Sequence, residues 1–173
     1  MIFSTKRLII REFEHFDLNS IHQYASLEHV TQYQAWGPNT LEQSQSFLSD
    51  ALSFSKNKPR IKYELGITLK STGELIGGCG IFIKGKERKK AMIGYTLNPN
   101  FWGNGFATEA TQGLILFGKN QLGLETIQAT CDIDNIGSKR VLEKCGMNLL
   151  ETIENHTMQK GKMRSSLLFG FGK

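Results

Sequence analysis

Two glycines one residue apart, Gly103 and Gly105, lie between a strand-like segment (residues 92–97) and a helix-like segment that ends near Leu122. Small residues follow the second glycine, so the start of the helix can present free backbone N–H groups. Such a helix start favours an anion, for example a pyrophosphate, because its N–H groups and its dipole both act on the ligand. An ordinary surface turn has the same pattern, since short glycine motifs occur widely. The loop alone therefore indicates either an anion site or a turn.

A second pair of polar residues, Asn135 and Ser138, opens another helix-like segment, residues 135–144. Asparagine is a favoured N-cap residue, and a serine three positions later falls in the first helical turn. Helix capping therefore explains the spacing, and a chemical role for the pair needs further support.

The composition is that of a globular protein with a small excess of positive charge. The 173 residues carry a formal net charge of +5, with 39% hydrophobic and 21% charged residues. This length predicts one domain over residues 1–173. No apolar run approaches the roughly 20 residues that span a bilayer, and the N-terminal segment lacks the apolar core of a secretory signal. We therefore expect a cytoplasmic protein with no membrane partner.

The three cysteines, Cys79, Cys131 and Cys145, are odd in number and include no C-x-x-C pair. This pattern favours buried, reduced thiols over a disulfide framework or a zinc site, so we expect no metal. A nucleophilic cysteine is an alternative, since its basic partner can be distant in sequence.

A basic cluster lies between two strand-like segments and consists of Lys84, Lys86, Arg88, Lys89 and Lys90. A solvated hairpin tip explains it, and a patch that meets phosphates or an acidic partner is the alternative. No RNA- or DNA-reading motif accompanies it, which argues against a nucleic-acid partner.

Hydrophobic periodicity predicts seven strands and four helices in the order strand, two helices, three strands, helix, strand, helix, two strands. The strand-like segments are 6–13, 63–69, 75–83, 91–97, 125–132, 147–156 and 164–171. The helix-like segments follow Asp17, Thr40 and the glycine loop, and the fourth is 135–144. This order predicts a mixed α/β or α+β fold.

Three motifs at their places in this order resemble the GCN5-related N-acetyltransferase (GNAT) superfamily over nearly the whole chain. Arg7–Arg11 with Asp17 is similar to the opening strand and helix start of that family. Ile93–Leu97 leading into Trp102–Ala110 resembles its acyl-CoA motif, and Asp134–Gly146 resembles its second motif. The opening Arg-Leu-x-x-Arg and the Asn-x-x-Ser are most similar to the RimJ/RimL-type branch.

The resemblance implies a mostly antiparallel sheet of about seven strands flanked by about four helices, in which strands 4 and 5 splay apart at Asn98–Pro99. It also implies that acetyl-CoA binds in the splay, with its pyrophosphate on the glycine loop. The implied cofactor-binding residues are Thr96, Leu97, Trp102, Gly103, Asn104, Gly105, Phe106, Ala107, Thr108, Asn135 and Ser138.

The implied reaction is direct attack of a primary amine on the thioester in a ternary complex. A backbone N–H at or near Leu97 would stabilise the oxyanion, Asn135 would bind the pantetheine or nearby backbone, and Ser138 would assist the leaving thiolate. Relatives carry a Tyr where this chain has Leu142 and a Glu where it has Met92. The general base is therefore unassigned, with ordered water, another carboxylate or an already neutral amine as alternatives.

The acceptor is either a protein N-terminus, such as that of a ribosomal protein, or a small amine. Trp36 and Tyr33 lie in the segment that lines the acceptor cleft in relatives, although core packing also explains each of them. Because Met92 and Leu142 replace catalytic types, a CoA-binding module without transfer activity is the alternative function. A homodimer is compatible with the sequence, which does not fix the oligomeric state.

Overall fold

The computed structural model describes residues 1–172, and its strands form one sheet in the order β1-β2-β3-β4-β5-β6-β8-β7. All neighbouring strands are antiparallel except β5 and β6. The strands are β1 Phe3–Ser4, β2 Leu8–Glu12, β3 Lys62–Leu69, β4 Leu75–Lys84, β5 Lys90–Leu97, β6 Thr126–Asp132, β7 Asn148–Gln159 and β8 Lys162–Phe171.

Five α-helices are described: α1 Leu18–Ala25, α2 Glu28–Thr31, α3 Leu41–Phe54, α4 Phe106–Asn120 and α5 Ile136–Lys144. Short 3-10 turns at His15–Asp17 and Pro99–Phe101 precede α1 and the glycine loop. The mixed fold class is confirmed, but the expected seven strands are eight and the expected four helices are five. The additional elements, β1 and α2, have two and four residues, which is too short for a periodic pattern.

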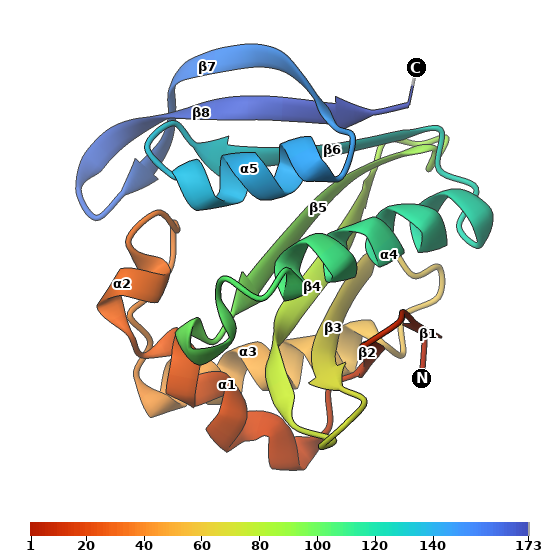
Figure 1. Ribbon diagram of the computed structural model, residues 1–173, viewed down its shortest axis with the longest axis vertical. Coiled ribbons are helices and arrows are strands. Elements are labelled where there is room, and N and C mark those ends of the chain that lie inside the picture. The colour runs from red at the N-terminus through yellow and green to blue at the C-terminus, as the bar shows by residue number, and fades with distance from the viewer. Residues whose placement is uncertain (173) are drawn as a thin grey trace.

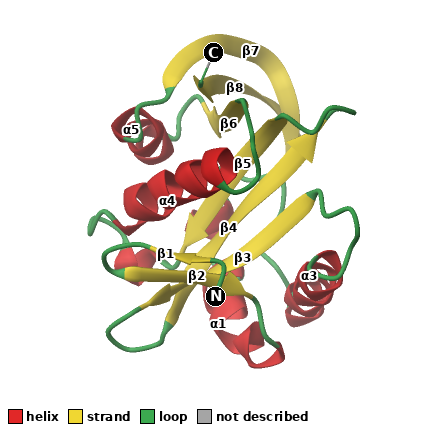
Figure 2. Ribbon diagram, turned by 90° about the vertical axis from the view of Figure 1, so that its right-hand side faces the viewer, coloured by secondary structure: helices red, strands yellow, loops and turns green. Residues whose placement is uncertain are grey.

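The helices cover both faces of a twisted sheet (Figures 1 and 2). Helix α4 packs over β2, β4 and β5, and α5 packs beside it against β6. On the opposite face, α1 packs against β4 and α3 packs against β3. The larger core cluster lies under α4 and contains Leu65, Ile81 and Leu114, whereas Phe13 and Leu48 belong to a smaller cluster at α1 and α3.

The start of α3 shows how local sequence fixes an element that borders the site. The Thr40 side chain accepts a hydrogen bond from the Gln43 backbone N–H, and the Gln43 side chain accepts one from the Thr40 N–H. This reciprocal capping box fixes the first turn of the helix.

The sheet opens between the parallel strands β5 and β6. They pair only from Lys90 to Met92 on β5 and from Thr126 to Gln128 on β6. Beyond this point β5 stays paired with β4 as far as Leu97, and β6 stays paired with β8 as far as Asp132. The expected splay is present, but the strands part six residues before Asn98 because each follows its own antiparallel neighbour and the sheet twist separates them.

None of the helices described in residues 1–172 is long and apolar enough to cross a membrane.

Candidate active site

The free edge of β5 presents backbone groups to the opening between β5 and β6. The Asn98 N–H donates to the Ile76 carbonyl of β4 at 2.8 Å, and hydrogen-bonded pairs alternate along an antiparallel ladder. The backbone of Thr96 is therefore directed at β4, whereas Tyr95 and Leu97 direct theirs at the opening. The expected N–H donor at Leu97 thus faces the opening. The backbone of Thr96, also expected to bind the cofactor, does not face it, whereas the backbones of its neighbours Tyr95 and Leu97 do.

The glycine loop leaves the first turn of α4 uncapped. Gly105 is the N-cap residue, with φ of +77°, and it has no side chain to accept the N–H groups of Phe106, Ala107 and Thr108. Within the described residues these three N–H groups have no hydrogen-bond acceptor, and a helix start supplies none of its own. Gly103 also has a positive φ, +76°, and both glycines are exposed. This geometry fits a phosphate group better than a capped turn would.

Contacts from the connection between β1 and β2 hold this loop in place. The Arg7 guanidinium donates to the Asn104 carbonyl at 3.0 Å and lies 4.3 Å from the centre of the Phe106 ring. The Glu109 carboxylate accepts hydrogen bonds from the Arg7 backbone N–H and from Arg7 Nε, both at 2.6 Å. Burial opposes ionisation of Glu109, but these bonds and one from Thr5 hold its pKa below the ordinary value.

Trp102, which was expected to contact the cofactor, makes a hydrogen bond to the end of β5. Its indole Nε1 donates to the Leu97 carbonyl at 2.9 Å, which satisfies that acceptor and leaves the Leu97 N–H as the free group. Asn104, also expected in the cofactor site, donates to the carbonyls of Phe101 and Trp102. Both side chains therefore shape the loop, whatever they bind.

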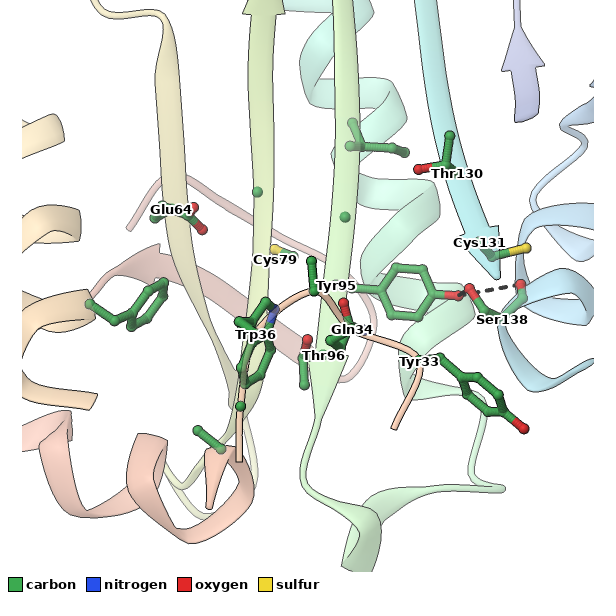
Figure 3. Close-up of a pocket in the computed structure, with 18 of the residues that line it drawn as sticks. Tyr33, Gln34, Trp36, Glu64, Cys79, Tyr95, Thr96, Thr130, Cys131 and Ser138 are labelled. Carbon is green, nitrogen blue, oxygen red and sulfur yellow. Dashed lines mark hydrogen bonds between the residues drawn. The ribbon is translucent and has the colours of Figure 1, made fainter. Parts of the chain in front are cut away.

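The start of α5 lies across the opening from β5. Asn135 is the N-cap of α5, and its Oδ1 accepts the Ser138 N–H at 3.0 Å, so the capping interpretation is confirmed. The Ser138 hydroxyl lies 2.9 Å from the Tyr95 hydroxyl, which reaches it from β5 (Figure 3). Burial raises the pKa of Tyr95, against a smaller lowering by the Ser138 hydrogen bond, so the phenol stays protonated. Leu142 is buried and adds no hydroxyl.

A cavity of about 930 Å³ adjoins the opening, and its lining includes Thr96, Asn135 and Ser138. One row of its wall runs across three strands, where Glu64 pairs with Gly80 and Gly80 pairs with Gly94. A Cβ at Gly94 would meet nothing within 4 Å, whereas one at Gly80 would lie 2.9 Å from the Phe82 ring. Glu64 is therefore the one residue of these three that is not glycine, and the space in front of Gly94 on β5 is open.

Among the carboxyl groups that line this cavity, Glu64 has the most strongly shifted pKa. Burial raises its pKa from the ordinary value of 4.5 to about 7, and Lys62 acts weakly in the opposite direction. Among the described residues no hydrogen bond or ion pair is recorded for its carboxylate. A carboxyl with a pKa near neutrality can exchange a proton with an amine at physiological pH.

The segment between α2 and α3 forms another wall of the cavity and carries both residues expected to contact the acceptor. Tyr33 and Trp36 line the cavity, and their segment crosses in front of β4 and β5 (Figure 3). Trp36 is 38% exposed, so it is not a core residue. Tyr33 also borders a smaller hollow of about 360 Å³ beside the β7–β8 turn.

Of the residues predicted from the sequence, Tyr33, Trp36, Thr96, Asn135 and Ser138 line the cavity, whereas Leu97 and the loop residues 102–108 are outside its lining. Two further groups were missed. Glu64 occupies an alternating strand position that suggests only a polar face, and nothing local indicates its burial. Tyr95 was part of the Gly-Tyr motif, but its contact with Ser138 depends on the opening between β5 and β6. No group of three or more His, Cys, Asp or Glu residues able to hold a metal occurs in the described chain.

Comparisons with known proteins identify this arrangement. The family model described as "Acetyltransferase (GNAT) domain" matches residues 7–148. The chain belongs to the GNAT acetyltransferase family. It is 35% identical over 147 residues to "Uncharacterized N-acetyltransferase YnaD" of Bacillus subtilis, which covers 85% of this chain and 82% of that protein.

Solved structures give the same fold. This GNAT protein superimposes on an acetyltransferase of the GNAT family from Bacillus anthracis with a TM-score of 0.86 and 27% identity, covering 97% and 96% of the two chains. A structure titled as the ribosomal L7/L12 α-N-protein acetyltransferase RimL with coenzyme A also has a TM-score of 0.86, over 98% of this chain and 96% of that one. Its identity is 16%, so this likeness concerns the fold alone.

As a member of this family the protein is an N-acetyltransferase that uses acetyl-CoA, which supplies the acetyl group as a thioester. The residues present fit such a donor. The uncapped N–H groups at Phe106–Thr108 can hold a pyrophosphate, and the backbone of Tyr95 together with the free Leu97 N–H on β5 can hold an amide-bearing arm. Membership in the GNAT family therefore argues against a module without transfer activity.

Proposed function

We propose that this N-acetyltransferase acetylates a small primary amine by direct attack in a ternary complex, with Glu64 as the general base. The observation that carries the proposal is the placement of two kinds of proton-transfer group on opposite sides of one cavity. The unpaired Glu64 carboxyl stands on β3, and the Tyr95–Ser138 hydroxyl pair stands at the opening between β5 and β6 (Figure 3).

Glu64 takes the role left vacant by Met92. An alkylamine with a pKa near that of lysine, about 10.4, arrives protonated at neutral pH and must lose a proton before it can attack. The strands β3 and β5 are two spacings apart, roughly 10 Å, and the acceptor amine or one water molecule fits between the carboxylate and Gly94. Glu64, with a pKa of about 7, is ionised in about half of the molecules at that pH.

Tyr95 and Ser138 act at the leaving sulfur, because this chain has Leu142 where relatives carry a tyrosine. Both hydroxyls are protonated donors, and their 2.9 Å contact lets one donate to the sulfur while it accepts from the other. The Leu97 N–H, which faces the opening, stabilises the developing oxyanion. Asn135 caps the start of α5 and lines the cavity.

The size and lining of the cavity support a small acceptor. A volume of about 930 Å³ is at the upper end for small-molecule sites, and the end of the acyl donor occupies part of it. A protein N-terminus, as in the RimJ/RimL-type branch, is the second candidate, and the resemblance of the two sequence motifs and the shared fold of RimL support it. The free, buried cysteines favour a cytoplasmic setting for the reaction.

The test is release of free CoA thiol from acetyl-CoA by the purified protein, with peptide N-termini and small alkyl- and arylamines as acceptors. Small amines should give turnover that falls at least a hundredfold in Glu64→Gln and about tenfold or more in Tyr95→Phe. Turnover with peptides alone would refute the small acceptor, and unchanged rates in Glu64→Gln would refute the base. Glu151→Gln, an exposed glutamate on β7, is the matched control.

A further inference from the structure

The cavity that receives the acceptor is acidic, although the protein as a whole is basic. Among the described residues that line it are Asp50, Glu64 and Asp132, and no Lys, Arg or His. The chain nevertheless carries 21 Lys and Arg against 16 Asp and Glu. The lining therefore excludes the cations that dominate the rest of the surface.

Asp132 is neutralised by a partner, but the other two carboxylates are not. Arg164 binds Asp132 through Nε at 2.8 Å and through Nη2 at 2.6 Å. No hydrogen bond or ion pair is recorded for Asp50 or Glu64 among the described residues. Lys62, which acts electrostatically on Glu64, lies with its ammonium 4.6 Å from the centre of the Phe54 ring and outside the lining.

Asp50 reaches the cavity from α3 at a different depth from Glu64. The residues of α3 that line the cavity are Gln43, Ser46, Phe47 and Asp50, whose spacing of three and four places them on one helix face. Asp50 is exposed, whereas Glu64 is partly buried. One negative charge thus stands at the mouth and the other deeper in the wall, with the apolar side chain of Phe47 on the same stripe.

A group of cations borders the smaller hollow, which shares Tyr33 and Gln159 with the main cavity. Lys160, Lys162 and Arg164 line that hollow, and Arg164 is held by Asp132 and Asp134. An acceptor with an anionic end would have to extend toward the two lysines, whereas one with a cationic end meets Asp50.

We propose that the preferred acceptor is a small diamine, whose reacting amine lies at Glu64 and whose second, charged amine lies at Asp50. The inference rests on the proposed function and adds to it the charge of the distal group. Two separated and unpaired carboxylates match two ammonium groups joined by an apolar chain, and a cleft of one charge sign raises the local concentration of its counter-ion. A carboxylate on the acceptor would be repelled by both.

Three acceptors with the same four-carbon chain separate the effect of charge from that of shape: 1,4-diaminobutane, butylamine and 4-aminobutyrate. The value of kcat/KM should be about three- to tenfold higher for the diamine than for butylamine, as expected for one partly exposed charge pair. It should be lower by a similar factor for 4-aminobutyrate. Asp50→Asn should reduce the diamine-to-butylamine ratio to near one, whereas Glu42→Gln, an exposed acid of α3 outside the lining, should retain it.

Equilibrium binding of the same three amines to the CoA-saturated protein gives a second readout that needs no turnover. Preferential binding of the diamine that is lost in Asp50→Asn supports the inference even if no thiol is released. Absence of thiol release would then refute only the proposed acetylation of small amines, and not the charge preference of the cavity. Equal binding of the three amines, binding of none, or a preference for 4-aminobutyrate would overturn the inference. A preference for the anionic amine would assign the distal contact to Lys160 and Lys162 instead.

Discussion

Replacing Glu64 by Gln should stabilise the protein above neutral pH while it removes the activity. The substitution keeps the size and shape of the side chain but removes the charge that burial disfavours. In the folded chain the carboxyl holds its proton up to a pKa of about 7, against an ordinary 4.5. Between these values the folded state binds a proton that the unfolded state has lost, so stability falls as the pH rises.

The magnitude follows from the two pKa values. One pKa unit corresponds to about 1.4 kcal/mol, so the wild-type protein loses up to about 3 kcal/mol between pH 4.5 and 7 that the glutamine variant keeps. The free energy of unfolding of the variant minus that of the wild type should therefore be larger at pH 8 than at pH 4.5 by up to that amount. Such a gain is large against the 5–15 kcal/mol of a typical domain.

The assay is urea unfolding of the wild type and of Glu64→Gln at pH 4.5 and pH 8, with Glu151→Gln as the control that shows no such change. In parallel, kcat/KM of the wild type should rise through an apparent pKa near 7, measured with two acceptors of different amine pKa. The variant should lose about 10²–10⁴-fold in turnover. If the stability difference between the two proteins is the same at both pH values, the carboxylate is not desolvated and its raised pKa cannot explain a base at this position.

Four further substitutions test other parts of the site. Gly105→Asp should abolish CoA binding, measured by calorimetry, because the side chain puts bulk and negative charge at the uncapped helix start; unchanged affinity would refute the pyrophosphate assignment. Tyr95→Phe and Ser138→Ala should each lower kcat about tenfold with little effect on CoA affinity, and their double variant should lose much less than the product; fully multiplicative losses would show that the hydroxyls act separately. Gly94→Val should fold normally, since its Cβ would meet open space, but should raise the KM for the amine at least tenfold; an unchanged KM would place the acceptor elsewhere.

Much of the fold could be predicted because long elements carry their own periodic signal. The strand predicted at 75–83 is β4, Leu75–Lys84, and the helix predicted behind Thr40 is α3, Leu41–Phe54. The two elements that were missed, β1 and α2, are held by their neighbours and have no such signal. The parting of β5 from β6 was misplaced because it depends on which neighbour each strand follows, whereas Pro99 marks only where β5 ends.

The site divides in the same way. The glycine loop and Asn135 are local features, and both were predicted as helix starts with free or capped N–H groups. Glu64 and Tyr95 acquire their roles only from strand pairing, which places one opposite two glycines and the other beside α5. Single-sequence patterns give neither the register of β3 on β4 nor the width of the opening.

The alternation of β5 explains how one strand serves both halves of the reaction. Its odd-numbered residues Tyr95 and Leu97 direct backbone groups into the opening, and the Tyr95 side chain reaches Ser138 on the side of α5. Its even-numbered Gly94 continues the row that begins at Glu64, on the face covered by α1 and α3. Any one-residue shift of β5 would exchange these sets, so it would put the phenol on the acceptor face and close the row. The register of β5 on β4, rather than any single side chain, therefore places the proposed proton acceptor and the proposed proton donor on opposite faces of this strand.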